Sequence, residues 1–239
     1  MEIYLMTWPE VESYLKNKKH LILPVGSTEQ HGPTGLIGTD FLTAWDLAKA
    51  VGKKTSTLVA SPLCYGMALH HMAFPGSGAL KPSTYIQVVK EIIQGYADQG
   101  FRHFSLINGH GGNIPSLQAA FSEILSSNQD YTLQLFNWWH LSSVTDYEQK
   151  NFGDANGFHA TCGEISVTMT CYPQAYEKKK TFEFFPTVKK TAWPLSPGQF
   201  RKTFPDGRMG SDPRLASAQH GQVIFERAVD EISQRLMET

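Results

Sequence analysis

Two glycine-rich segments of this chain carry residue types that bind metal ions. The first, GSTEQHGPTGLIGTD, contains Glu29, His31 and Asp40, and the second, NGHGGN, contains His110. Carboxylate and imidazole groups are the ligands that hold zinc, manganese or iron in proteins. Glycine lets the backbone reach positive φ and approach a ligand closely, so both segments are predicted to be shaped loops. Together they indicate the metal centre of a metallohydrolase.

These residues differ in how well a purely structural role would explain them. Glu29 and His31 are two positions apart, so on an extended segment both side chains point the same way and can reach one site. Asp40 opens a predicted helix, and helix capping is an equally good explanation for it alone. A core histidine rarely needs three neighbouring glycines, which favours a functional His110. A phosphate loop is the weaker alternative for NGHGGN, because the segment matches no phosphate-binding pattern and has no nearby lysine.

A third segment, GFHATCGEISVTM, adds His159 and Glu164. Taken alone, each is more often a structural or surface residue. Their spacing does not place them on one helical face. We therefore expect His159 on the loop before a helix and Glu164 within the first turns of that helix.

Composition narrows the class of protein. The chain has 239 residues, 41% of them hydrophobic and 18% charged, with a formal net charge of −1. This length supports a substantial core and one large domain, expected to span residues 1–239. The charge disfavours nucleic-acid binding, and the apolar runs are too short for a membrane span. The N-terminus lacks the pattern of a signal peptide, and Cys64, Cys162 and Cys171 form no CxxC motif, so reduced thiols in the cytoplasm are expected.

Short apolar or β-branched runs alternate with stretches of helical periodicity. Four runs are predicted to be strands: His20–Val25, Thr57–Pro62, His103–Ile107 and Thr132–Asn137. Five stretches are predicted to be helices: Asp40–Val51, Thr84–Gln99, Asn113–Ser127, Thr161–Cys171 and Pro213–Met237. Thr84 and Gln87 are expected to cap the second helix, and Gly100 to end it. The alternation predicts an α/β fold with a largely parallel sheet covered on both faces.

The two glycine-rich loops each directly follow a predicted strand. In open α/β sheets, ligands bind beyond the carboxyl ends of the strands. The polar residues of both loops are therefore expected to converge at one edge of the sheet. Residues 173–212 differ from the rest because they are rich in proline and aromatic residues, and a connection of this kind is expected to be a lid, an oligomer contact or a loop.

The three segments resemble the creatininase family of metal-dependent amidohydrolases, which has a GSxEQHGP…GTD loop, an NGHGGN loop and an HAxxxExS segment in that order. Two further stretches, HMAFPGSGALKPST and GSDPRLASAQHG, are similar to other segments of the family. The resemblance spans nearly the whole chain. It implies a three-layer α/β/α fold with a mostly parallel central sheet, a centre of one or two metal ions, and commonly a hexamer.

The resemblance also implies roles for individual residues. Glu29, His31, Asp40 and His110 correspond to metal ligands, with Asp40 bridging two ions. Glu164 corresponds to the remaining carboxylate ligand. By the same resemblance, His159 becomes the proton-handling residue.

The chain departs from the family pattern at four positions. Enzymes that hydrolyse creatinine resemble one another in having Tyr-Glu after the loop histidine, and that glutamate binds the second metal. Gly111 and Gly112 stand in that place here, which disfavours creatinine as the substrate and gives more weight to Glu164. Thr161 and Ile165 replace the usual glycine and threonine of the third segment, so a reshaped pocket is expected.

Together with the family resemblance, these residues predict a metal-dependent amidohydrolase that cleaves a non-peptide C–N bond (amide, lactam or formamide) of a small molecule. Two divalent ions, zinc, manganese or iron, would convert a bridging water to hydroxide near neutral pH. The hydroxide would attack the carbonyl, and His159 would protonate the leaving nitrogen. Trp138 and Trp139 are candidates for stacking on a flat substrate, although core packing explains at least one of them. His71 is a candidate for the pocket wall.

Two other classes remain open from the sequence. In a cysteine hydrolase, Cys162 would be the nucleophile with His159 and a carboxylate, but Glu29, Asp40 and His110 would then have no purpose. In a non-catalytic ligand-binding protein, the metal would serve stability alone. Structural zinc sites are usually closed and rich in sulfur or imidazole, unlike this carboxylate-rich set.

The family resemblance and the segment 173–212 predict a homo-oligomer, most simply a hexamer. Light scattering of the protein at micromolar concentration should then give about six times the 26.7 kDa mass of one chain. A single species of monomer mass would contradict this expectation.

Overall fold

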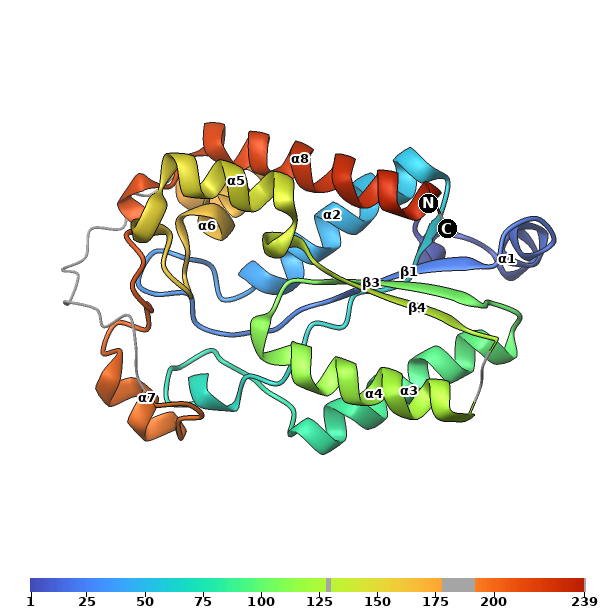
Figure 1. Cartoon of the computed structure of the whole chain (residues 1–239), viewed down its shortest axis with the longest axis horizontal. Helices are drawn as coiled ribbons and strands as arrows, with labels where there is room; N and C mark the ends of the chain where they lie inside the picture. The colour runs from blue at the N-terminus through green and yellow to red at the C-terminus, as the bar shows by residue number, and fades with distance from the viewer. Residues whose placement is uncertain (128–129, 178–191, 239) are drawn as a thin grey trace.

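Four parallel strands form the central sheet of the computed structural model, which describes residues 1–127, 130–177 and 192–238 (Figure 1). The spatial order is β2-β1-β3-β4, with the bounds Leu58–Val59, His20–Val25, His103–Asn108 and Thr132–Asn137. The register pairs Val25 with Asn108 and Asn108 with Asn137. The carboxyl ends of β1, β3 and β4 therefore lie level, and the loops that follow them leave from one edge.

Helices cover both faces of this sheet. Those of the described residues are α1 Trp8–Leu15, α2 Thr39–Thr55, α3 Pro82–Asp98, α4 Ile114–Ser127, α5 Ser142–Asn151, α6 Cys162–Cys171, α7 Pro197–Thr203 and α8 Ala218–Met237. Short 3-10 turns are η1 Ile3–Leu5, η2 Leu69–His71, η3 Gly111–Asn113, η4 Trp138–His140, η5 Gly153–Asn156, η6 Pro173–Tyr176 and η7 Pro213–Leu215. Helices α3 and α4 lie on one face, and α2, α6 and α8 lie on the other with α5 beside them (Figure 1). This three-layer α/β arrangement confirms the predicted fold class.

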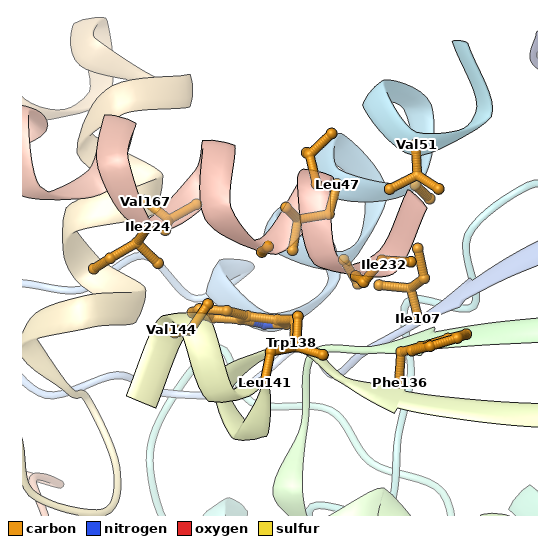
Figure 2. Close-up of a cluster of buried hydrophobic side chains, with 14 of the residues drawn as sticks. Leu47, Val51, Ile107, Phe136, Trp138, Leu141, Val144, Val167, Ile224 and Ile232 are labelled. Carbon is orange, nitrogen blue, oxygen red and sulfur yellow. The ribbon is translucent and has the colours of Figure 1, made fainter. Parts of the chain in front are cut away.

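The sheet is buried between two apolar clusters. Ile22 of β1 packs into the cluster that contains α2 and α8, whereas Leu21 and Leu23 pack into the cluster that contains α3. Figure 2 shows the first cluster, whose labelled members include Leu47, Ile107 and Ile232. All six residues of β1 are buried, as expected for a strand with helices on both sides.

Several predicted boundaries were wrong. Helix α3 begins at Pro82, with Lys81 as its N-cap and no side-chain cap, so the predicted capping pair of Thr84 and Gln87 is absent. Proline at the first helical position has its φ already set for a helix, which explains the earlier start. Strand β2 keeps only two residues of the predicted run. Beyond it, Ala60 and Leu63 still donate to backbone carbonyls of β1, but without regular strand geometry.

Three helices were not predicted, namely α1, α5 and α7. Local start sites were visible for two of them, since Thr7 and Glu10 form a capping box at α1, as Ser196 and Gln199 do at α7. Helix α5 buries only Val144 and Glu148, so it has no apolar periodicity to detect.

The proline-rich segment 173–212 is only partly described, and its residues 178–191 lie outside the described range. On its C-terminal side, Phe200 and Phe204 of the α7 region pack with Phe74 in a third apolar cluster. The function expected for the whole segment therefore stays a prediction. None of the helices in the described part of the chain is long and apolar enough to cross a membrane.

The buried Tyr85 and the half-buried Tyr14 offer a paired test of this core. The Tyr85 hydroxyl is buried with no hydrogen-bond partner among the described residues, whereas the Tyr14 hydroxyl donates to His20 O at 2.7 Å. Tyr85→Phe should raise the free energy of unfolding by about 1 kcal/mol, because it removes an unsatisfied buried group. Tyr14→Phe should lower it by about 1 kcal/mol. Urea unfolding of both variants checks the pair, and equal effects of the same sign would refute this reading.

Candidate metal centre

The loop after β1 and the start of α2 bring three predicted ligands together. Glu29, His31 and Asp40 are 0%, 1% and 3% exposed. Asp40 lies in the first turn of α2, but Gly38 is the N-cap of that helix. The Asp40 carboxylate turns inward instead, with Oδ1 2.9 Å from His31 Nε2. Asp40 is therefore not the capping residue that the alternative reading suggested.

Glycines hold the two loops against α2. A Cβ atom at Gly26, just after β1, would overlap the backbone of Phe41. A Cβ atom at Gly109, just after β3, would overlap the carbonyl oxygen of Asp40. Only glycine allows backbone contacts this close. The convergence predicted from the strand ends is thus achieved by direct contact at Asp40.

His110 enters the same space from the loop after β3. Its Nδ1 lies 3.1 Å from Asp40 Oδ2 and 3.2 Å from Glu29 Oε1. Asn108 fixes the backbone of His110, since its Nδ2 donates to His110 O at 2.8 Å and its Oδ1 accepts from His110 N at 3.1 Å. The ring faces two carboxylates, which does not suit a phosphate loop.

The third segment supplies Glu164 and His159, as expected, from the first turn of α6 and the loop before it. Glu164 Oε2 accepts from the backbone and hydroxyl of Thr161 at the helix N-cap, at 3.0 and 2.8 Å. Its Oε1 lies 3.3 Å from His31 Nε2. One oxygen of this carboxylate thus stabilises the helix while the other faces the cluster.

Gln30, to which the sequence analysis assigned no role, orders two of the histidines. Its Oε1 accepts from Gly32 N at 2.8 Å, so its amide nitrogen faces His71 Nδ1 at 2.8 Å. His159 Nε2 lies 2.8 Å from the carbonyl oxygen of Gln30 and donates to it. His159 Nδ1 is then free of its proton and lies 3.8 Å from Glu29 Oε1. The position of Gln30 between two ligands in EQHG was the only hint of this role.

These side chains form three overlapping groups whose ligand atoms lie within 4.8 Å of one another: Glu29 with His31 and His159, Glu29 with Asp40 and His110, and His31 with Asp40 and Glu164. Both oxygens of Glu29, Nε2 of His31 and Oδ2 of Asp40 are buried and make no hydrogen bond of good geometry among the described residues, although all but Glu29 Oε2 lie within ion-pair distance of a neighbouring side chain. Burying such atoms without partners is costly. A divalent cation would satisfy them, so the residues present fit a metal centre.

Charge distribution supports this fit. Burial opposes ionisation of Glu29, yet the charges of His110 and His71 hold its pKa well below the usual range. Burial opposes protonation of His110, yet Glu29 and Asp40 raise its pKa to about 10. Burial, with the charges of His71 and His31, keeps the pKa of His159 well below its usual value. His110 therefore carries a proton and pairs with Glu29 and Asp40, and a bound metal ion would displace that proton. His159 is instead an uncharged base.

A cavity of about 300 Å³ opens onto the cluster. It is lined by Asp40, His110, Glu164, Trp138, Trp139 and Glu148, among others. Trp138 also belongs to the core beneath the cavity and is 2% exposed (Figure 2). His71 is placed behind Glu29, with Nε2 3.2 Å from Glu29 Oε1, and it is not among the lining residues. Glu148 was not identified from the sequence.

Cys162 is placed away from this cavity. It is fully buried, and its thiol donates to the carbonyl oxygens of Ala155 and Asp212 at 3.3 and 3.1 Å. Burial raises the pKa of this thiol to about 12. A buried, protonated and hydrogen-bonded thiol is a poor nucleophile, so the geometry argues against the cysteine mechanism.

Gly111 and Gly112 differ in the space that a side chain would have at each position. A Cβ atom at Gly112 would overlap the His110 ring and lie 2.6 Å from Met67 O. A Cβ atom at Gly111 would meet only Trp139, at 3.9 Å. This loop therefore cannot carry a glutamate at Gly112, whereas the space beside Gly111 belongs to the cavity.

Comparison with known proteins gives a consistent set of relatives. A family model described as creatininase, creatinine amidohydrolase, matches residues 4–236. The 3-dehydro-scyllo-inosose hydrolase of Thermotoga maritima is 32% identical over 176 residues, which are 71% of this chain and 55% of that relative, so the match spans about half of its length. The creatinine amidohydrolase of Pseudomonas putida is 26% identical over 252 residues, covering 98% of this chain and 95% of that protein. The mycofactocin precursor peptide peptidase of Mycolicibacterium smegmatis is 31% identical over 230 residues, covering 90% and 83%.

Solved structures agree with these relatives. A creatininase mutant of the zinc–zinc type superposes with a TM-score of 0.84 at 25% identity, covering 99% of this chain and 97% of that one. A manganese creatininase superposes with a TM-score of 0.81 at 25% identity and the same coverage.

The contrast between the two glycines gives a matched prediction. Gly112→Ala should displace the His110 ring and lower metal content about tenfold under limiting metal, with the circular dichroism spectrum unchanged. Gly111→Ala should leave metal content at the wild-type level. Elemental analysis of both purified variants checks this, and full metal content in Gly112→Ala would show that His110 is not needed for binding.

Proposed function

Since the chain belongs to the creatininase family, we propose that it is a metal-dependent amidohydrolase that cleaves a non-peptide C–N bond of a small molecule. The observation that carries the proposal is the buried cluster of carboxylates and imidazoles at the bottom of a cavity, with several ligand atoms that make no hydrogen bond of good geometry among the described residues. A purely structural metal site would not need an open cavity above it. The cavity therefore favours catalysis over metal binding for stability alone.

The ligand groups suggest how two ions would be held. Glu29, Asp40 and His110 would bind one ion, and His31, Asp40 and Glu164 the other, with Asp40 shared. The relatives of known structure include zinc and manganese forms, which supports either metal here. Two such ions would supply Lewis acidity, which lowers the pKa of water and polarises a carbonyl group.

His159 is the residue we assign to proton transfer. It is uncharged at neutral pH, and its Nδ1 faces the cluster because its Nε2 donates to Gln30 O. A neutral imidazole in this position can take a proton from the attacking water and deliver it to the leaving nitrogen. His71 would position Glu29 rather than touch the substrate.

The cavity supports a small molecule as the substrate. About 300 Å³ accommodates a small molecule, and Trp139 offers an aromatic surface beside it. Relatives are named for creatinine, for an inosose and for a precursor peptide, so the family name alone does not fix the bond. We propose a cyclic amide or a formamide other than creatinine, because the glycine at position 111 leaves room that a larger side chain would fill.

The test compares two residues two positions apart. In Glu164→Gln, the neutral amide binds a divalent ion poorly, so we expect loss of one of the two metal ions and a fall in turnover of about 100-fold. In Cys162→Ser, metal content and turnover should stay near the wild-type values. Metal counting, followed by a screen of cyclic amides and formamides, measures both.

The opposite pattern would overturn the proposal. An inactive Cys162→Ser variant with unchanged metal content would make the thiol the nucleophile. Full turnover by protein stripped with a chelator would likewise exclude a metal-dependent reaction.

A further inference from the structure

Glu148 is a buried carboxylate in the cavity that the metal centre does not use. It lies on α5 and is 6% exposed, yet it lines the cavity above the cluster. It belongs to none of the three groups of metal-capable side chains. Its Oε1 is buried and has no hydrogen-bond partner among the described residues.

The surrounding residues hold this carboxylate in one orientation. Asn156 donates from Nδ2 to Glu148 Oε2 at 2.9 Å, and its Oδ1 accepts from Gly163 N at 3.1 Å. A Cβ atom at Gly163 would overlap Glu148 Oε1. Gly163, at the start of α6, therefore leaves the space that the carboxylate of Glu148 occupies. Asn156 determines that Oε2 is the oxygen that accepts a hydrogen bond from the protein.

No permanent cation of the protein compensates Glu148 within the cavity. The described lining residues include the carboxylates of Asp40 and Glu164 but no lysine or arginine. Burial and the charge of Glu164 raise the pKa of Glu148 to about 8. A buried carboxylate oxygen left unpaired costs free energy, so a partner from outside the protein is the simplest explanation for its retention.

We propose that Glu148 is a specificity-determining residue whose carboxylate accepts a hydrogen bond from a basic, N–H-bearing group of the substrate. The inference rests on the proposed function and narrows its substrate class to small amides that also carry an amine or amidine. A cation beside Glu148 favours the ionised carboxylate, and such charge-assisted hydrogen bonds are stronger than neutral ones. Phe158 and Trp139 line the same cavity, and aromatic faces attract cations.

Glutamine at position 148 would reverse the polarity of this contact. Asn156 Nδ2 needs an acceptor, so the glutamine amide would turn its oxygen to Asn156 and its NH₂ group to the cavity. The variant therefore presents a donor where the wild-type carboxylate, once ionised beside a cation, presents an acceptor. Glu148→Gln changes the volume little, so packing against Gly163 is retained.

The experiment measures binding of metal-chelating hydroxamates to the zinc-loaded protein by calorimetry. One series carries an amine at the end of a chain of two to four carbons, and the matched series carries a methyl group there. We expect the wild type to bind the best amine probe about tenfold more tightly than its methyl counterpart. Glu148→Gln should abolish this preference with methyl-probe affinity unchanged, and Glu12→Gln, an exposed control on α1, should keep it.

The outcomes separate this inference from the proposed function. If wild-type protein binds both series equally, and Glu148→Gln alters neither, the role of Glu148 is refuted while the metal centre stands. If the protein neither retains zinc nor binds any hydroxamate, the metal centre itself fails and the inference with it. A wild-type preference for the amine probe that persists in Glu148→Gln would also refute the role, because Asp40 and Glu164 line the same cavity.

Discussion

The contact of two strand ends with one turn of helix is the constraint on which the site depends. Gly26 and Gly109 follow β1 and β3, and each lies against the backbone at Asp40 and Phe41 with no room for a Cβ atom. Because the strands are level at this edge, the contact brings both ligand loops to the carboxylate of Asp40. A larger residue at either glycine would separate the loops and spread the ligands apart.

The cluster is also an example of side chains that serve the fold and the site together. Glu164 completes the capping box of α6 with one oxygen and faces His31 with the other. The side-chain amide of Gln30 forms hydrogen bonds with Gly32 and His71. Its backbone carbonyl accepts a hydrogen bond from His159 Nε2 and so determines which ring nitrogen of His159 carries the proton. The positions of these candidate metal ligands are thus fixed by hydrogen bonds of the fold itself. Such preorganised partners tune both metal affinity and ligand orientation.

Sequence reasoning found what depends on local pattern. The strands that end in the ligand loops, the loop position of His159 and the helical position of Glu164 all followed from spacing and turn residues. Gln30 and Glu148 were missed because their roles arise from contacts with distant segments. Glu148 in particular lies on a mostly polar helix, where a buried glutamate has the same sequence context as an exposed one. Only the space above Gly163 distinguishes it, and that space exists only once α5 and α6 are packed together.

The crowding at Gly112 bears on how such an enzyme can change over evolutionary time. A carboxylate cannot be moved to that position by one substitution, since the loop would first have to withdraw from the His110 ring and from Met67. A loop shifted in this way would also displace His110 from the two carboxylates that it faces. A new carboxylate at this position would therefore need concerted changes in the loop after β3 and around Met67, whereas the cavity wall beside Gly111 can accept single substitutions.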